Sequence, residues 1–274
     1  MNTMPTTPES QDANDGDDMS PLLSEPFARA WAAPATGLPG RLGERLGERL
    51  ARSLQAEQGM VTVRRRKSDA LPLADGVLQR PLYRAPTDRP ARPGEPRAVS
   101  VIELAAGATL TLPAGGSREF LVLRGSAEVD GEALSLRDFL LLPAGSAPQL
   151  GSADGAHLFV REMDGPGAER TLVRDREAGW PEFAPGIARR VLWTAGGEAA
   201  LLYRADPGAS VPGHGHGHDE ECLMVQGELF LDDVLLQQGD YQLAPAGTGH
   251  RITETDTGVI IYAHGDLDLQ FNGT

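Results

Sequence analysis

The amino-acid sequence predicts an all-β protein with two similar domains in tandem, each forming a barrel or jelly roll. Glycine (33 residues) and proline (21) are abundant among the 274 residues, as expected for many short strands joined by turns. After Met60, short apolar runs such as 120–123 and 259–262 alternate with turn residues. The chain also contains an internal repeat of about a hundred residues, and each copy is long enough to form its own β-domain.

Residues 1–38 form a polar, acidic leader. Aspartates gather near its start, several Pro, Ala and Gly follow, and no apolar period stands out. A segment of this composition cannot bury enough apolar surface to offset the conformational entropy lost on folding. We therefore expect the leader to be disordered.

A short amphipathic helix is predicted over residues 39–57. Leu42, Leu46, Leu50 and Leu54 recur every fourth residue, which places them on one face of a helix. The charged residues between them form few attractive pairs, so packing must hold the helix. Two interpretations remain: the helix caps one of the domains, or it presents residues 42–54 to a partner protein.

The internal repeat is clearest in two blocks with the same offset. Residues 118–125 align with 220–227, and residues 137–145 align with 239–247, both at an offset of 102. Upstream, residues 76–83 align with 186–193 at an offset of 110. The first copy therefore carries about eight extra residues, which we place in the loop 87–96. The predicted domains are residues 58–165 and 166–274.

Side chains suited to a metal ion stand in the second copy. His214 and His216 are two residues apart, so both point to the same side of a strand. Glu220 follows where the next strand begins, and His250 ends a later hairpin. Three imidazoles and one carboxylate are a natural ligand set for a divalent transition metal.

These residues resemble the two motifs of the cupin superfamily. The first is His-x-His followed by a glutamate and a glycine, and the second is Gly-x5-Pro-x-Gly-x2-His, matched here by Gly239, Pro245, Gly247 and His250. The resemblance covers both copies, roughly residues 65–274. It implies the double-stranded β-helix fold, one divalent metal inside the second domain and an open position there for a small-molecule ligand.

Three histidines at alternate positions leave a choice of register. The family's interval between its first histidine and the glutamate favours His214, His216 and Glu220. The alternative, with His216 and His218, would place Cys222 where the carboxylate belongs. In the preferred register His218 lies outside the ligand set. His157 and His264 have no partners in either motif, so we interpret both as ordinary strand residues.

The first copy lacks all four ligands. The offset of 102 places Leu112, Ala114, Arg118 and Pro148 at the ligand positions. The glycines, Pro143 and the apolar strands remain, and these are the residues that the fold itself requires. We expect a degenerate, metal-free first domain that serves as a packing partner for the second.

Within the superfamily, the second copy resembles the C-terminal cupin of ChrR-type anti-sigma factors. Residues 186–193, 203–209, the paired Glu220 and Glu221, and residues 239–241 carry this resemblance. It implies a sensing or regulatory cupin, with zinc as the usual metal. Those anti-sigma factors bind their sigma factor through a zinc domain with a His-x3-Cys-x2-Cys motif, and this sequence has no His or Cys before His157. We therefore predict a ChrR-like sensor without that domain.

The same ligand set supports a second hypothesis, a metal-dependent dioxygenase acting on a small chelating substrate. Three His and one Glu resemble the iron, manganese or nickel sites of cupin dioxygenases. Imidazole binds these metals as well as zinc, so the ligands leave the metal and any enzymatic activity open. The sequence indicates no separate catalytic residue. Cys222, two residues after Glu220, either tunes the metal, senses an oxidant or only fills space.

Charge and cysteine content narrow the cellular setting. The formal net charge of −14 repels phosphate backbones, so we do not expect nucleic-acid binding. We interpret the basic run 64–67 as a solvated strand end. No apolar run approaches the ~20 residues that cross a bilayer, and no secretory signal is present. One cysteine precludes an internal disulfide. We expect a cytoplasmic protein, with a homodimer formed through edge strands as a further expectation.

Overall fold

The computed structural model describes residues 40–56, 59–92, 94–164 and 169–271. The chain divides into two units, residues 1–51 and 52–274. Helix α2 (Gly40–Ala56) agrees with the helix predicted over 39–57, whereas the predicted disordered leader lies outside the described residues. Among the helices of the described part of the chain, none has both the length and the apolar character needed to cross a membrane.

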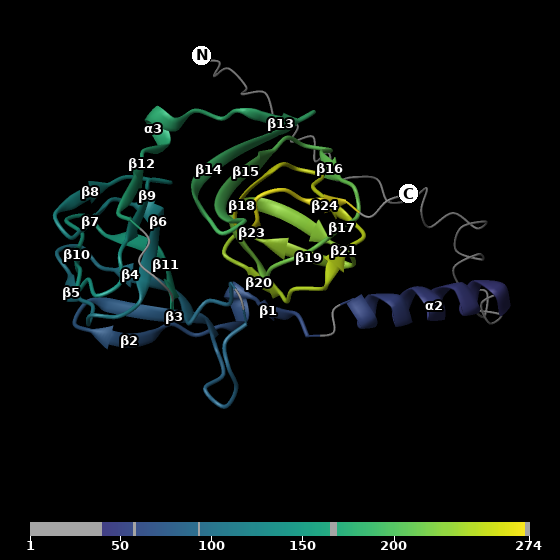
Figure 1. The fold of residues 1–274 in the computed structure, drawn as a ribbon, viewed down its shortest axis with the longest axis horizontal. Coiled ribbons are helices and arrows are strands. Elements are labelled where there is room, and N and C mark those ends of the chain that lie inside the picture. Colours follow the sequence, from purple (N-terminus) through teal and green to yellow (C-terminus); the bar gives the residue numbers. More distant parts are fainter. Residues whose placement is uncertain (1–39, 57–58, 93, 165–168, 272–274) are drawn as a thin grey trace, which may run out of the picture. The chain divides into compact units, whose positions relative to one another are not determined.

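The first copy of the repeat folds into a jelly roll of two sheets around one core (Figure 1). One sheet has seven strands in the order β12-β9-β6-β11-β4-β3-β2, and the other has four in the order β5-β10-β7-β8. Phe120 and Leu140 of the larger sheet and Val129 and Leu150 of the smaller one are fully buried in this core. The strands are β2 (Leu71–Ala74), β3 (Val77–Arg84), β4 (Ala98–Leu104), β5 (Thr109–Thr111), β6 (Ser117–Gly125), β7 (Ala127–Val129), β8 (Glu132–Leu134), β9 (Phe139–Leu142), β10 (Gln149–Gly151), β11 (Ala156–Met163) and β12 (Thr171–Val173).

The second copy forms a second jelly roll. Its larger sheet follows the order β1-β20-β18-β23-β15-β14-β13, with β16, β19 and β22 attached, and its smaller sheet follows β21-β17-β24. The strands are β1 (Val61–Val63), β13 (Glu182–Ala184), β14 (Ile187–Ala195), β15 (Glu198–Ala205), β16 (Ser210–Val211), β17 (His214–Gly215), β18 (Glu220–Leu231), β19 (Val234–Gln237), β20 (Tyr241–Ala244), β21 (Gly249–His250), β22 (Thr253–Glu254), β23 (Val259–Asp266) and β24 (Gln270–Phe271). In neither copy do the described strands close into a continuous hydrogen-bonded barrel. The predicted cupin-type fold is confirmed in its jelly-roll form.

Each jelly roll takes an edge strand from the segment that precedes the other. Strand β1 precedes the first jelly roll but pairs with β20 of the second, with Val61 opposite Leu243. Strand β12 precedes the second jelly roll but pairs with β9 of the first, with Thr171 opposite Leu141. Val61 and Thr171 are related by the repeat offset of 110, and Leu141 and Leu243 by the offset of 102, so the exchange is symmetric. A boundary between residues 165 and 166 therefore separates the two copies but not their sheets.

A shared apolar core holds the two jelly rolls together. Leu121 and Phe159 of the first jelly roll pack in one buried cluster with Leu202 and Tyr262 of the second. The rings of Phe159 and Tyr262 lie 4.7 Å apart between centroids. Burial of a large apolar side chain contributes roughly 1.5–3 kcal/mol, so a cluster of this kind fixes the two domains against each other.

The connection between the first two long strands differs between the copies. It spans residues 85–97 between β3 and β4 but only residues 196–197 between β14 and β15. The longer connection contains the loop 87–96, where the repeat predicts the extra residues. Its Arg92 reaches the second jelly roll and pairs with Asp219, with 2.7 Å between the guanidinium and the carboxylate. The loop thus lies close to the predicted metal ligands.

Candidate metal centre

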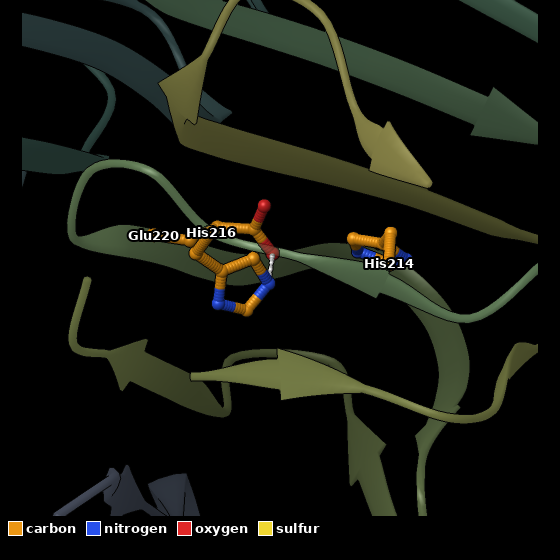
Figure 2. A group of neighbouring side chains, drawn as sticks. All are labelled: His214, His216 and Glu220. Carbon is orange, nitrogen blue, oxygen red and sulfur yellow. Dashed lines mark ion pairs between the residues drawn. The ribbon is translucent and has the colours of Figure 1, made fainter. Parts of the chain in front are cut away.

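Two short strands and the start of a longer one bring the predicted ligands together. His214 in β17 lies directly opposite His250 in β21. Glu220 is the first residue of β18, and Figure 2 shows its carboxylate beside the His216 ring. The close pairing of β17 and β21 requires a glycine at position 249, because a Cβ there would lie 2.5 Å from the carbonyl oxygen of His214.

The four predicted ligands surround one small volume. The ligand atoms of His214, His216 and Glu220 all lie within 4.8 Å of one another. The Nε2 atom of His216 is 3.4 Å from Glu220 Oε1, and the Nε2 atom of His250 is 4.0 Å from the same oxygen. All three imidazoles are buried, while Glu220 is partly exposed. The grouping follows the register that starts at His214, and the metal itself stays a prediction.

A hydrogen-bond chain fixes the tautomer of His216. The hydroxyl of Thr248 donates its only hydrogen to the carbonyl oxygen of Pro245 over 2.6 Å. Thr248 Oγ1 must therefore accept the hydrogen bond that links it to His216 Nδ1 over 3.2 Å. The proton of the neutral ring lies on Nδ1, and Nε2 presents a lone pair toward Glu220.

The other two histidines are held in the same tautomer. His214 Nδ1 donates to the carbonyl oxygen of Pro212 over 3.1 Å, and His250 Nδ1 donates to Asp232 Oδ2 over 3.4 Å. Burial raises the pKa of Asp232, but its hydrogen bonds to His250 and Arg251 outweigh this and keep the pKa below its ordinary value. A carboxylate behind a ligating histidine is the usual arrangement at metal sites, because it orients the ring and makes the ligand more basic.

The residues present fit a divalent cation. His216 Nε2 is buried and has no hydrogen-bond partner among the described residues, although it faces a carboxylate oxygen. Two lone-pair donors facing each other repel, and an unsatisfied buried polar atom costs about 1–3 kcal/mol. Burial also lowers the pKa of His216 despite the attraction of Glu220, which favours the neutral ring that a metal requires. A cation among these atoms would satisfy all of them at once.

An apolar cavity of about 70 Å³ adjoins the ligands. His214 and Glu220 line it together with aliphatic side chains of β15 and β23, among them Leu201 and Ile261. A volume of ~10–15 Å³ is enough for one water molecule. The cavity therefore has room for several waters or for an organic ligand of a few heavy atoms, in contact with the ligand side chains.

Cys222 lines the cavity but is not a reactive thiolate. Its Sγ lies 3.8 Å from Glu220 Oε1. Burial, reinforced by the charge of Glu220, raises the pKa of the thiol well above its ordinary value. A protonated, buried thiol is a weak nucleophile and oxidises slowly. Of the three roles that the sequence leaves open for Cys222, this favours space-filling over direct sensing of an oxidant.

Two further side chains near the ligands point elsewhere. His218 contacts Asp266 through Nδ1, and its Nε2 lies 3.9 Å from Glu198 Oε1, so its nitrogens do not converge with the other ligands. Glu221 accepts hydrogen bonds from Arg161 and Tyr241 on the opposite side of β18 from Glu220. Only the first of the two adjacent glutamates therefore faces the three histidines.

Sequence reasoning missed the partners of the histidines. Thr248 stands two residues before His250 within the second motif, and this position is the one available signal for its role. The position of Asp232 in the sequence gives no sign that it contacts His250. The two residues meet only because β18 pairs with β22 in the folded chain.

In the first jelly roll a cation replaces the carboxylate. Arg118 lies opposite Leu142, just as Glu220 lies opposite Ala244. Its guanidinium is 3.3 Å from Glu162 Oε1 and is almost fully buried. The loss of the ligands is thus accompanied by an internal ion pair.

Comparison with known proteins agrees with this fold. Residues 168–268 match the family model described as a ChrR cupin-like domain. A search of curated proteins found no match. A candidate dioxygenase from Nostoc punctiforme superposes with a TM-score of 0.60 at 13% identity, covering 78% of this chain and 87% of that one.

Two other solved structures are similar to the same extent. A candidate glyoxylate-induced protein from Pseudomonas aeruginosa gives a TM-score of 0.59 at 12% identity, covering 78% of this chain and 90% of that one. A deletion mutant of Bacillus subtilis oxalate decarboxylase gives 0.54 at 16% identity, covering 75% and 76%. Mn(II) centres are described for that decarboxylase. At these identities the likeness establishes a two-domain cupin fold and nothing finer.

Proposed function

We propose that the protein is a ChrR-like sensing cupin whose second jelly roll binds one divalent metal, and zinc is the first candidate for that metal. The ligands are His214, His216, Glu220 and His250. The observation that carries this proposal is the buried Nε2 of His216, which lies 3.4 Å from Glu220 Oε1 and has no hydrogen-bond partner within the described part of the chain. Three neutral imidazoles and one carboxylate satisfy zinc, and also iron, manganese or nickel. The ligand that is sensed is a small molecule that enters the adjoining apolar cavity.

Three consecutive acidic residues support a sensing role. Asp219 holds Arg92 of the first jelly roll, Glu220 faces the histidines, and Glu221 binds Arg161 of the first jelly roll with 2.6 Å between N and O. Because these residues are adjacent in the chain at the start of β18, a shift of Glu220 moves both contacts to the first jelly roll. The occupancy of the metal centre is thereby coupled to the junction of the domains.

A metal-dependent dioxygenase is the second candidate. The apolar cavity beside His214 and Glu220 favours it, because a small substrate there would lie next to an open coordination position and away from bulk water. This function requires a redox-active metal. The two candidates therefore differ in a quantity that is simple to measure.

The first test is elemental analysis of the full-length protein purified without added metal or chelator. We expect about one zinc per chain in the wild type and a loss of metal in His216→Ala and His250→Ala, because each removes one ligand. His218→Gln is the matched control, since it alters a neighbouring histidine outside the ligand set. Metal retained in His216→Ala, or lost from His218→Gln, would contradict the ligand assignment.

The second test separates a sensor from an enzyme. For a sensor, metal removal should increase hydrogen exchange in loop 85–97 and at the start of β18, where Arg92 and Glu221 connect the two jelly rolls. Unchanged exchange in both segments argues against sensing. Iron, manganese or nickel at one per chain, together with oxygen consumption, would establish the dioxygenase instead.

A further inference from the structure

Two adjoining hollows, distinct from the cavity beside the predicted metal ligands, carry a concentration of basic side chains. The larger, of about 900 Å³, is lined by residues 64–67 together with β3, β19 and the turn after β19. The smaller, of about 180 Å³, shares Arg65 and Arg80 with it and reaches β4, β6 and β11. We call them together the basic groove, and its basic residues are Arg64, Arg65, Arg66, Lys67, Arg80 and Arg124.

The basic groove is positive in a strongly negative protein. Its six basic residues face three acidic lining residues, Glu103, Glu228 and Asp240, in a chain of net charge −14. Asp240 pairs with Arg64 at 2.9 Å, and Glu103 pairs with Arg80 at 3.2 Å. The remaining four basic side chains are exposed and, within the described part of the chain, make no ion pair; they are Arg65, Arg66, Lys67 and Arg124.

The internal repeat supplies a built-in comparison for this charge. The offset of 110 takes Arg65 to Asp175 and Arg80 to Arg190. In the second copy Asp175 neutralises Arg190 at 2.7 Å and Arg137 at 2.8 Å. The groove has an arginine where the second copy has this carboxylate. Arg80, the equivalent of Arg190, pairs with Glu103 instead, so Arg65 adds a positive charge that makes no ion pair within the described part of the chain.

The same comparison shows that the equivalent place is filled in the second copy. Trp180 stacks there with its ring 4.2 Å from the guanidinium of Arg190 and packs against the shared core. The corresponding residue of the first copy is Ala70, which has no ring to occupy such a space. The first copy thus has a small side chain where the second copy has a large aromatic ring beside its arginine.

His157 lines the smaller hollow, and the nearby arginines affect its pKa. It is half-buried on β11, between Glu103 on β4 and Arg124 on β6. Burial lowers the pKa of His157, and the charges of Arg124, Arg65 and Arg80 lower it further, against the opposing effect of Glu103. Its neutral ring is available to hydrogen-bond a ligand among the arginines.

From this arrangement we propose that the basic groove is a second ligand site, one that binds a compact polyanion of the phosphate class. Guanidinium groups present paired donors that match phosphate oxygens. The basic groove has four cations that make no ion pair within the described residues, which suits a ligand with more than one negative charge. The net charge of −14 repels a long polyanion such as nucleic acid, whereas a small anion feels mainly the local cluster.

The test is calorimetric titration of the full-length protein with pyrophosphate at low ionic strength. We expect binding that weakens with added salt, and a loss of at least about tenfold in affinity for Arg65→Asp and for Arg124→Gln. Arg65→Asp installs the residue that the second copy has at this position. Arg176→Gln is the control, because it is the repeat equivalent of Arg66 and is 83% exposed outside the groove. Its affinity should equal that of the wild type.

Nuclear magnetic resonance of the imidazole gives a second readout. Pyrophosphate should raise the pKa of His157, because the anion screens the arginines that now lower it. Pyrophosphate could also release heat by chelating a bound metal, but this heat would be the same in all variants. The difference between Arg65→Asp and Arg176→Gln therefore measures binding to the basic groove.

Several results would overturn the proposal. These are no binding up to about 10 mM pyrophosphate, an equal loss in Arg176→Gln, or an unchanged His157 titration at saturating pyrophosphate. Tighter binding of a single-stranded oligonucleotide than of pyrophosphate would replace the compact anion by nucleic acid.

Discussion

Arg161 of the first jelly roll donates a hydrogen bond from Nε to Glu221 Oε1 of the second over 2.6 Å, and both side chains are fully buried. A second carboxylate, Glu119, lies 3.4 Å from the same guanidinium. Tyr241 donates its hydroxyl to Glu221, and Tyr262 donates to Glu119. One cation thus serves two buried acids, one from each domain.

This cluster follows the symmetry of the repeat but breaks it at one position. Glu119 and Glu221 are equivalent at the offset of 102, and the strand registers make Arg161 equivalent to His264. His264 is fully buried, and in the part of the chain that the structure describes neither ring nitrogen has a hydrogen-bond partner. Burial, and then the charge of Arg161, hold its pKa well below the ordinary value, so the ring stays neutral. Arg161 is therefore the one cation of this cluster, and its charge compensates the two buried glutamates, one from each jelly roll.

Replacing Arg161 should destabilise the protein strongly. Arg161→Met leaves two buried carboxylates without their cation, and breaking a buried pair in this way costs about 3–5 kcal/mol. Denaturant unfolding measures the loss. Arg176→Met, at an exposed arginine, should change the free energy of unfolding by no more than about 0.5 kcal/mol. A loss below about 1 kcal/mol for Arg161→Met would mean that water or protons already compensate the acids.

The stability of the protein should depend on the protonation of Glu119. Burial, only partly opposed by Arg161 and Tyr262, raises the pKa of Glu119 from 4.5 to about 7. The folded state therefore holds this proton more tightly than the unfolded state. The resulting stabilisation is complete below pH 4.5 and is lost as the pH rises toward 7, by at most about 3 kcal/mol.

Glu119→Gln isolates this effect, because glutamine resembles the protonated acid at every pH. Between pH 4.5 and 7 the unfolding free energy of the wild type should fall relative to that of Glu119→Gln. The measurement is denaturant unfolding of both proteins at a series of pH values. A difference that is constant across this range would show that folding does not raise the pKa of Glu119.

Thr248→Val should weaken metal binding without removing a ligand. The variant deprives His216 Nδ1 of its acceptor, so the ring is no longer held with Nε2 toward Glu220. Loss of such a supporting hydrogen bond lowers metal affinity by about 10–100-fold. Competition with a chromogenic chelator measures this affinity. Thr257→Val is the matched control at an exposed threonine, and an equal affinity in both variants would assign the proton of His216 to the other nitrogen.

The two exchanged strands should differ in their effect on the metal centre. Val63 of β1 lies opposite Tyr241, and Val173 of β12 lies opposite Phe139; both pack against the shared core. An aspartate at either position places an unpaired charge against that core and destabilises the fold. Only β20, which β1 supports, leads directly into the segment that carries His250.

We therefore expect Val63→Asp to lower metal affinity and Val173→Asp to leave it near the wild-type value, under conditions in which both remain folded. Chelator competition, with circular dichroism as the check on folding, separates the two. Equal losses of affinity would mean that the metal centre responds to overall stability instead of to its own sheet.

The sequence alone determined the features that depend on local spacing. Leucines at every fourth residue predicted α2, and the offsets of 102 and 110 located both copies and the long connection at 85–97. His214 and His216 share a strand face because side chains alternate, and the second motif identified His250. The structure then brought these three residues together with Glu220.

Only the tertiary structure decided what each copy contributes to the other. Strands β1 and β12 occupy equivalent positions of the repeat. Strands of three residues carry too little sequence pattern to show which sheet they join. Glu119, Arg161 and His264 look like ordinary strand residues in the sequence, and their common burial arises only when two domains pack face to face. Local pattern encodes strands and turns, whereas the balance of buried charge depends on residues more than forty positions apart along the chain.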